Sequence, residues 1–299
     1  MRRHRTTARG ILLLTLAALL TTGAAAAHAV KPAGKVPRLV FPLLGPATLT
    51  DDFGDARGQG SHEGNDLMAP WRALVVAAEA GTVKFWTTSA RAGCMLYLDG
   101  KSGTTYLYIH LNNDLTDEND NKGKCVPGVS YAEDLRNGAK VQAGQVIAYN
   151  GNSGDADGIH PHLHFEVHPG GRAAIDPLPH LKKARRLLFA AAPGSLFTLA
   201  LTGTVVEAAG EELRLRLDVV RSWPGGRKIE QSGRTVHVAV PPTASIEGVA
   251  GPVALSTGTL DSLGAGTAVT VFTEPAKATL AAQAGARNAL AAKRVVVRR

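Results

Sequence analysis

The sequence predicts an all-β protein with two domains, an antiparallel β-sheet domain followed by a small β-barrel or β-sandwich domain. Turn signals that contain glycine recur from Val36 to about His180, and short apolar runs lie between them. Closely spaced short strands with such turns are typical of antiparallel sheets and barrels. The runs that we expect to form strands in this first domain are residues 73–77, 94–98, 104–109 and 145–149.

A second β pattern begins after Ser195. Leucine and arginine alternate over residues 213–217, which predicts a strand with one buried and one solvent-facing side. We therefore expect a C-terminal domain of five or six strands spanning residues 195–299. Its predicted strands lie at residues 197–206, 213–220, 235–240, 269–272 and 294–297.

Residues 181–194 differ in composition from both β regions. The segment 181–188 contains a basic run and is a candidate for a short helix with a solvated face. The alanine-rich stretch that ends in Pro193 and Gly194 then has the composition of a connecting segment. We expect residues 181–194 to be a linker between the two domains.

The first residues have the features of a secretory signal peptide. Four arginines precede residue 10, and an apolar stretch runs from Ile11 to about Leu20. This stretch is too short to span a bilayer. The segment 27–29 (Ala-His-Ala) then supplies small residues at the spacing that a signal peptidase recognises. We expect residues 1–29 to be removed by general secretion, and the mature chain to be secreted or held in the cell envelope.

Removal of this segment changes the charge balance. Four of the 33 Lys and Arg residues and none of the 25 Asp and Glu residues lie in it, so the net charge falls from +8 to +4. This mild positive charge favours contact with anionic envelope polymers and does not indicate a nucleic-acid partner. No later hydrophobic stretch is long enough to span a bilayer, so we expect no transmembrane anchor after signal removal.

The chain contains two cysteines, Cys94 and Cys125. An exported protein folds in an oxidising compartment, where a lone pair of cysteines usually forms a disulfide. Their spacing lacks the Cys-x-x-Cys pairing of many zinc sites. We therefore predict a disulfide between them.

Histidine and aspartate residues at two places suggest a metal site. His62 and Asp66 are four residues apart, and His162 and His164 are two residues apart in a segment with strand-like alternation. Side chains two apart on a strand share a face. Two histidines and one carboxylate leave the fourth tetrahedral position of a zinc ion open, as in a catalytic rather than a structural zinc site. The helical His-Glu-x-x-His motif is absent, so the ligands must come from strands and loops.

Another histidine, His110, ends the strongly β-forming segment 104–109 and precedes a polar loop. A residue at such a position can point into a cleft at the end of a sheet. Glu166, two residues beyond His164, is a candidate to accept a hydrogen bond from the ring N–H of a metal-binding histidine. The acidic segment 114–123 does not match the calcium loop of an EF-hand, and we expect a solvated loop.

These motifs resemble those of the lysostaphin/LytM-type zinc endopeptidases, which cut peptides of the bacterial cell wall. The resemblance covers about residues 38–180 and is carried by three motifs in order, with suitable intervals. They are His62-x-Gly-x-Asp66, Tyr108-Ile-His110-Leu111 and Pro161-His162-Leu-His164-Phe-Glu166. The resemblance implies a zinc peptidase domain over residues 36–180 with a duplicated hybrid motif-like β fold.

The resemblance also implies roles for five residues. His62, Asp66 and His164 would bind one Zn²⁺, and His110 and His162 would be the catalytic pair. The sequence does not say which of the pair is the general base. The implied substrates are peptidoglycan stem or cross-bridge peptides. The alternative is a non-catalytic envelope protein that binds peptidoglycan or activates another hydrolase.

The chain departs from the family pattern at two places. Trp71-Arg72-Ala73 stands where relatives carry a small glycine-containing turn, and the stretch 112–132 is longer than the family minimum. These departures put the choice of substrate in doubt and leave the five presumed site residues untouched. The role of the C-terminal domain is open; binding of anionic cell-wall polymers is one candidate.

Overall fold

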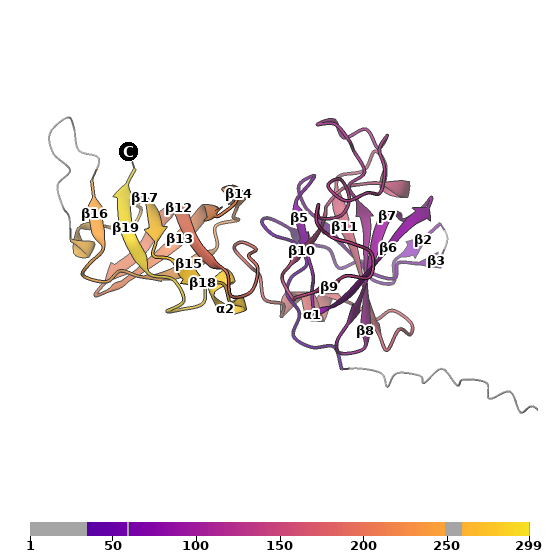
Figure 1. The fold of residues 1–299 in the computed structure, drawn as a ribbon, viewed down its shortest axis with the longest axis horizontal. Coiled ribbons are helices and arrows are strands. Elements are labelled where there is room, and N and C mark those ends of the chain that lie inside the picture. Colours follow the sequence, from indigo (N-terminus) through magenta and orange to yellow (C-terminus); the bar gives the residue numbers. More distant parts are fainter. Residues whose placement is uncertain (1–34, 59, 249–258, 299) are drawn as a thin grey trace, which may run out of the picture. The chain divides into compact units, whose positions relative to one another are not determined.

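The computed structural model describes residues 35–58, 60–248 and 259–298, so the predicted signal peptide, residues 1–29, lies outside the described residues. The described chain is built mainly of β-strands, which confirms the predicted all-β class (Figure 1). Its helical elements are short: α1 (Leu178–Lys182), α2 (Leu280–Gln283) and two 3₁₀ turns, η1 (Gly154–Ala156) and η2 (Leu260–Ser262). Within the described residues, the helices are too short and too polar to cross a bilayer.

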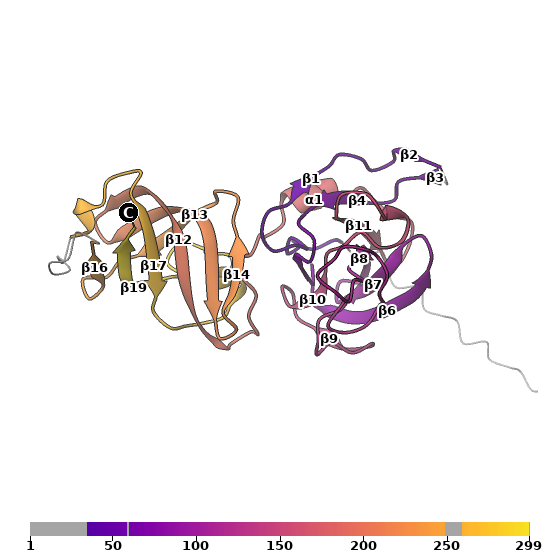
Figure 2. The same cartoon turned by 90° about the horizontal axis from the view of Figure 1, so that it is seen from above.

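A seven-stranded antiparallel sheet forms the first domain, with the strand order β1-β4-β11-β8-β7-β6-β9. Figure 2 shows β4, β11, β8, β7 and β6 following one another in this order. Two smaller pairs, β5 with β10 and β2 with β3, accompany the sheet. The strand bounds are β1 Thr48–Leu49, β2 Ala56–Arg57, β3 Gly60–Ser61, β4 Asn65–Met68, β5 Leu74–Val76, β6 Gly81–Ser89, β7 Gly93–Gly100, β8 Thr104–Leu111, β9 Lys140–Val141, β10 Val146–Tyr149 and β11 His162–Pro169.

Strand β11, which lies between β4 and β8 inside the sheet, has two chemically different faces. Leu163, Phe165 and Val167 point into the hydrophobic core, where each is fully buried. Alternation along the strand places His162, His164, Glu166 and His168 on the opposite face. The apolar face fixes the register of the strand, because a slip of one residue would turn the polar set into the hydrophobic core.

The pairing of β11 with its neighbours brings distant residues together. His164 lies directly opposite Asp66 on β4 and opposite Ile109 on β8. Directly opposed residues in an antiparallel pair have Cβ atoms about 4.5–5.5 Å apart. The register alone therefore brings Asp66 and His164 side by side, although 98 residues separate them in the chain.

The predicted disulfide between Cys94 and Cys125 is present. It ties β7 to the long stretch 112–132. The same stretch is held by Trp71, whose ring N–H donates to Asn112 Oδ1 and Asp114 Oδ2, both at 2.9 Å. Asp114 Oδ1 also accepts the backbone N–H groups of residues 120 and 121. Hydrogen bonds thus join the turn at Trp71 to the stretch 112–132, the two places where the sequence departs from the family pattern. Within the predicted solvated loop, Asp114 is buried.

The C-terminal domain contains a sheet with the strand order β14-β13-β12-β17-β19-β16, in which β15 also pairs with β13 and β18 with β12. The pairings are antiparallel except for β16 with β19. The described part of this domain thus has eight strands, more than the five or six that we predicted. Their bounds are β12 Leu196–Ala209, β13 Glu212–Trp223, β14 Arg227–Glu230, β15 Thr235–Ala239, β16 Ser245–Glu247, β17 Ala268–Thr273, β18 Ala276–Lys277 and β19 Ala292–Val297.

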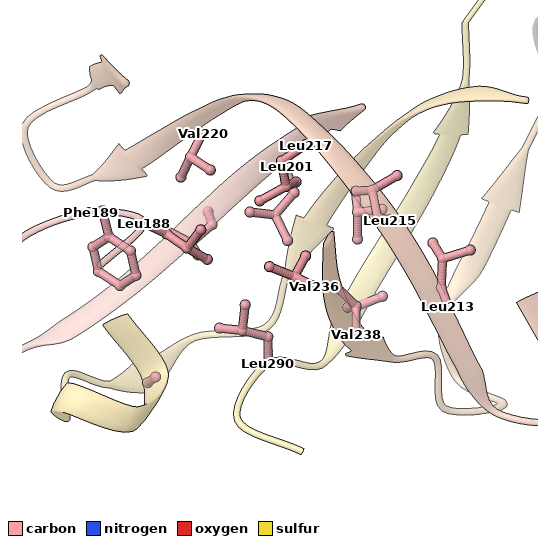
Figure 3. Close-up of a cluster of buried hydrophobic side chains, with 14 of the residues drawn as sticks. Leu188, Phe189, Leu201, Leu213, Leu215, Leu217, Val220, Val236, Val238 and Leu290 are labelled. Atoms are coloured by element: carbon pink, nitrogen blue, oxygen red, sulfur yellow. The ribbon is translucent and has the colours of Figure 1, made fainter. Parts of the chain in front are cut away.

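The segment expected to be a linker is partly buried. Leu188 and Phe189 have no exposed surface and belong to the same hydrophobic cluster as Leu201, Leu215 and Val238 (Figure 3). The helix expected over residues 181–188 is instead α1, which begins earlier and ends at Lys182. The apolar residues at the end of the predicted helix therefore serve as core residues in a segment that is neither helix nor strand.

Candidate metal centre and active site

Three side chains from two parts of the chain converge on one point. His62 precedes β4, Asp66 lies on β4 and His164 lies on β11; all three are buried. His62 Nε2 is 2.8 Å from His164 Nδ1 and 3.2 Å from Asp66 Oδ1, and His164 Nδ1 is 3.1 Å from Asp66 Oδ1. Each residue thus offers one atom, and the three atoms lie within 4.8 Å of one another, as in a group that can hold a metal ion.

The hydrogen bonds of the two histidines decide which ring nitrogen faces this point. His62 Nδ1 is 2.8 Å from the main-chain carbonyl of Asp52, and a carbonyl oxygen only accepts. His164 Nε2 is 2.9 Å from the Glu166 carboxylate. Each ring therefore has an acceptor outside the centre for one ring nitrogen, and its other ring nitrogen faces the centre. Glu166 thus lies within hydrogen-bond distance of the ring of the predicted ligand His164.

The electrostatics of the centre favour a positive charge. Burial lowers the pKa of His164, but hydrogen bonds to Asp66 and Glu166 outweigh it and raise the pKa to about 9. Burial raises the pKa of Asp66, but hydrogen bonds to His164 and His62 hold it well below its usual range. The site thus places a carboxylate and two imidazole nitrogens around one point and favours a positive charge there, either a proton on His164 or a metal ion. The donor set of two imidazoles and one carboxylate fits Zn²⁺.

His110 and His162 stand beside this centre with their ring centroids 5.0 Å apart. His110 Nδ1 donates to the carbonyl of Ser153 at 2.8 Å, and His162 Nδ1 donates to the carbonyl of His160 at 3.0 Å. Nδ1 of each ring is therefore engaged with the main chain, and His162 Nε2 is 3.8 Å from Asp66 Oδ1. Burial and the neighbouring His162 lower the pKa of His110 to about 4, so its ring is neutral near pH 7.

A β-bulge directs His110 toward the site. The register of β8 with β7 shifts between Cys94 and Leu96. At this shift, the side chains around His110 no longer alternate regularly between the two faces of the sheet. His110 itself has φ = 61°, a left-handed conformation that costs a residue other than glycine roughly 1–3 kcal/mol. Regular alternation would place His110 on the buried face with Tyr106 and Tyr108. The bulge re-aims its side chain, as bulges do at many active sites.

Two further residues support Asp66, and the sequence analysis did not assign them a role. The Arg57 guanidinium, on β2, donates to Asp66 Oδ2 at 3.1 Å. The side chain of Asp52 accepts the backbone N–H of Asp66 at 3.3 Å. Because Arg57 holds Oδ2, Oδ1 is the oxygen that faces the histidines. No spacing motif in the sequence links Arg57 to Asp66, so its role follows from the fold.

The centre lies in a cleft of about 1000 Å³. The walls combine carboxylates, two arginines and apolar side chains. Among the lining residues are Asp55, Arg57, Glu63, Arg91, Asp155 and Ile159, in addition to all five predicted site residues. The cleft is therefore large enough for an extended peptide with both charged and apolar groups.

No family model matches the chain. Several solved structures are similar to about half of the chain. They include the catalytic domain of the antimicrobial peptidase lysostaphin from Staphylococcus simulans, with 24% identity over 46% of this chain and 92% of that one, at a TM-score of 0.36. A putative glycyl-glycine endopeptidase lytM from Ruminococcus gnavus has 26% identity over 48% and 59% of the two chains, at a TM-score of 0.38.

A zinc-containing peptidase from Vibrio cholerae has 23% identity over 52% of this chain and 41% of that one, at a TM-score of 0.36. The chain thus spans about three fifths or less of the last two proteins. These structures are of the type that the sequence motifs resemble. Since the TM-scores are below 0.5, the function proposed below rests on the residues of the site and their geometry.

Proposed function

We propose that the protein is an exported zinc metalloendopeptidase that hydrolyses peptide bonds in peptidoglycan stems or cross-bridges. The single observation that carries this proposal is the convergence of Nε2 of His62, Oδ1 of Asp66 and Nδ1 of His164, with the rings of His110 and His162 beside them. A non-catalytic binding protein would have no need of the second pair.

The proposed mechanism divides the work between two sets of side chains. His62, Asp66 and His164 would hold one Zn²⁺, which supplies Lewis-acid chemistry by acidifying a water and polarising a peptide carbonyl. Nδ1 of both His110 and His162 donates to a main-chain carbonyl, which leaves Nε2 of each ring available for proton transfer. One ring accepts the proton of the attacking water and passes it to the leaving amine. The other, in its protonated form, stabilises negative charge on the carbonyl oxygen.

The test is hydrolysis of purified cell walls by the full chain, measured as newly released amino groups. We expect a chelator to abolish release and added zinc to restore it. His164→Ala should lose stoichiometric zinc, since it removes a ligand. His110→Ala should keep zinc and lose turnover by about 10²–10⁴-fold, the usual contribution of a general acid or base.

A matched control is His237→Ala, because His237 lies in the C-terminal domain and bonds to Glu212. That variant should keep both zinc and turnover. Retention of stoichiometric zinc by His164→Ala would show that the ligand assignment is wrong. Zinc binding by the wild type without any release of amino groups would favour the non-catalytic alternative, and zymography on cell-wall gels provides an independent check.

A further inference from the structure

Hydrogen bonds link three side chains in a row along β11, from the predicted metal ligand His164 through Glu166 to His168. Glu166 Oε1 is 2.9 Å from His164 Nε2, and Glu166 Oε2 is 2.5 Å from His168 Nε2. Glu166 is buried, and the side chain of His168 is 16% exposed. The spacing of two residues places all three on one face of the strand. One carboxylate thus joins a ring inside the metal centre to a ring outside it.

The hydrogen bonds of His168 indicate that it carries a positive charge. Its Nδ1 is 2.8 Å from the main-chain carbonyl of Arg172, which accepts only, so Nδ1 carries a proton. Its Nε2 contacts the Glu166 carboxylate, which also accepts. Both ring nitrogens therefore donate, as in an imidazolium ion.

The turn after β11 holds the ring of His168 in place. Gly170 and Gly171 have φ values of 66° and 69°, which glycine adopts without steric cost. The N–H of Gly171 donates to the carbonyl of His168, and the N–H of Arg172 donates to the carbonyl of Pro169. This tight turn folds the Arg172 carbonyl back over the end of the strand. The acceptor for His168 Nδ1 is therefore part of the main-chain fold.

We propose that His168 is a positioning residue of the metal centre, which acts through Glu166 to set the orientation and the donor strength of His164. An ion pair with His168 fixes the Glu166 carboxylate and offsets its negative charge. Without it, Glu166 would be a buried carboxylate free to turn away from the His164 N–H, and the ring of His164 would lose its support. The inference rests on the proposed function in one respect, the binding of a metal by His164.

The test measures zinc affinity by competition with a chromophoric chelator, independently of hydrolysis. His168→Ala should weaken zinc binding about 10–100-fold, the usual effect of losing a partner that orients a metal-binding histidine. His168→Gln keeps a donor for Glu166 and should recover part of this loss. The visible spectrum of the cobalt-substituted protein should shift in His168→Ala, because the geometry of the His164 ligand changes.

A double-mutant cycle with Glu166→Gln shows whether His168 acts through Glu166. In that background, His168→Ala should change zinc affinity less than threefold, because the link to His164 is already weakened.

His180→Ala is the matched control on α1 and should bind zinc as the wild type does. Unchanged zinc affinity in His168→Ala, or additive effects of the two substitutions, would overturn the inference. Failure of the wild type to bind zinc would overturn the proposed function as well.

Discussion

At the scale of single residues, the candidate site is organised by hydrogen bonds that fix histidine rings. Each of the five histidines in or next to the centre commits one ring nitrogen to an acceptor outside it. For four of them an acceptor is a main-chain carbonyl, that of Asp52, Ser153, His160 or Arg172. Every residue has a main-chain carbonyl, so the amino-acid sequence does not show which carbonyl accepts each of these hydrogen bonds. They depend on the fold alone.

Close packing around His164 makes Gly64 a sensitive position. A Cβ atom on Gly64 would lie 2.6 Å from the carbonyl oxygen of Phe165 and 2.8 Å from His164 Nε2, the atom that donates to Glu166. We therefore expect Gly64→Ala to displace the His164 ring. It should lower zinc affinity and hydrolysis at least tenfold, and destabilise the protein by about 1–3 kcal/mol, as overpacking does.

Gly264→Ala is the control for this substitution, because a Cβ atom there would meet no heavy atom within 4 Å. Zinc titration and thermal unfolding of both variants provide the comparison. Wild-type zinc affinity in Gly64→Ala would show that the ring of His164 has more freedom than its contacts indicate.

At the scale of strands, the sequence analysis predicted the features that depend on local alternation of apolar and polar side chains. It missed the features that depend on the pairing of one strand with another. The common face of His162 and His164 follows from a period of two residues, and all four predicted strands of the first domain are present. The bulge at His110 depends on the partner strand β7, so no local pattern announces it. The link from His168 to Glu166 depends on a turn that brings in the Arg172 carbonyl.

The C-terminal domain shows the same limit. The predicted strands there correspond to β12, β13, β15, β17 and β19, which are long enough to alternate or are rich in valine. The missed strands β16 and β18 have three and two residues, and β14 has four residues of which only Ile229 is buried. Such short segments carry too few apolar residues for a periodic signal, and their partners decide that they are strands.

The disulfide is the element-scale feature with the clearest effect on stability. Cys94 and Cys125 are 31 residues apart, and closing a loop of that length stabilises a protein by about 3–4 kcal/mol in the chain-entropy model. The Cys94→Ser/Cys125→Ser double variant should therefore unfold at a lower temperature or denaturant concentration than the wild type. Denaturant unfolding measured by circular dichroism gives the difference in the free energy of unfolding.

A reductant provides the internal control for that comparison. It should destabilise the wild type to about the level of the double variant and leave the double variant unchanged. Equal stability of the oxidised wild type and the double variant would mean that the contacts of Trp71 with Asn112 and Asp114 suffice to order the loop.

At the scale of the whole molecule, charge is divided unequally between the two halves. Residues 30–194 contain 17 basic residues (Lys and Arg) and 17 acidic residues (Asp and Glu). Residues 195–299 contain 12 basic and 8 acidic residues. The net charge of +4 expected for the mature chain therefore comes from the C-terminal half. Long-range attraction to an anionic surface follows net charge and its distribution. This asymmetry favours the C-terminal domain as the part that contacts anionic cell-wall polymers.

Neutralising exposed lysines tests that assignment in the full chain. Lys228, Lys277 and Lys293 are exposed residues of the C-terminal domain. Their joint replacement by serine lowers the net charge of residues 195–299 from +4 to +1. We expect weaker retention on cell walls and a smaller decrease of retention between low and high salt, because salt screens exposed charges over about 10 Å at 0.1 M. Hydrolysis of a small soluble muropeptide should be unchanged, since such a substrate needs only the cleft.

The matched control removes the same charge from the first domain, by replacing the exposed residues Lys101, Lys124 and Lys140 with serine. Both triple variants have the same total charge, so a difference between them reports where the charge lies. If retention followed total charge alone, the two variants would bind walls equally, and the C-terminal domain would have no special part in adhesion. Stronger loss in the C-terminal variant would separate the two tasks: adhesion through residues 195–299 and hydrolysis through the cleft around His164.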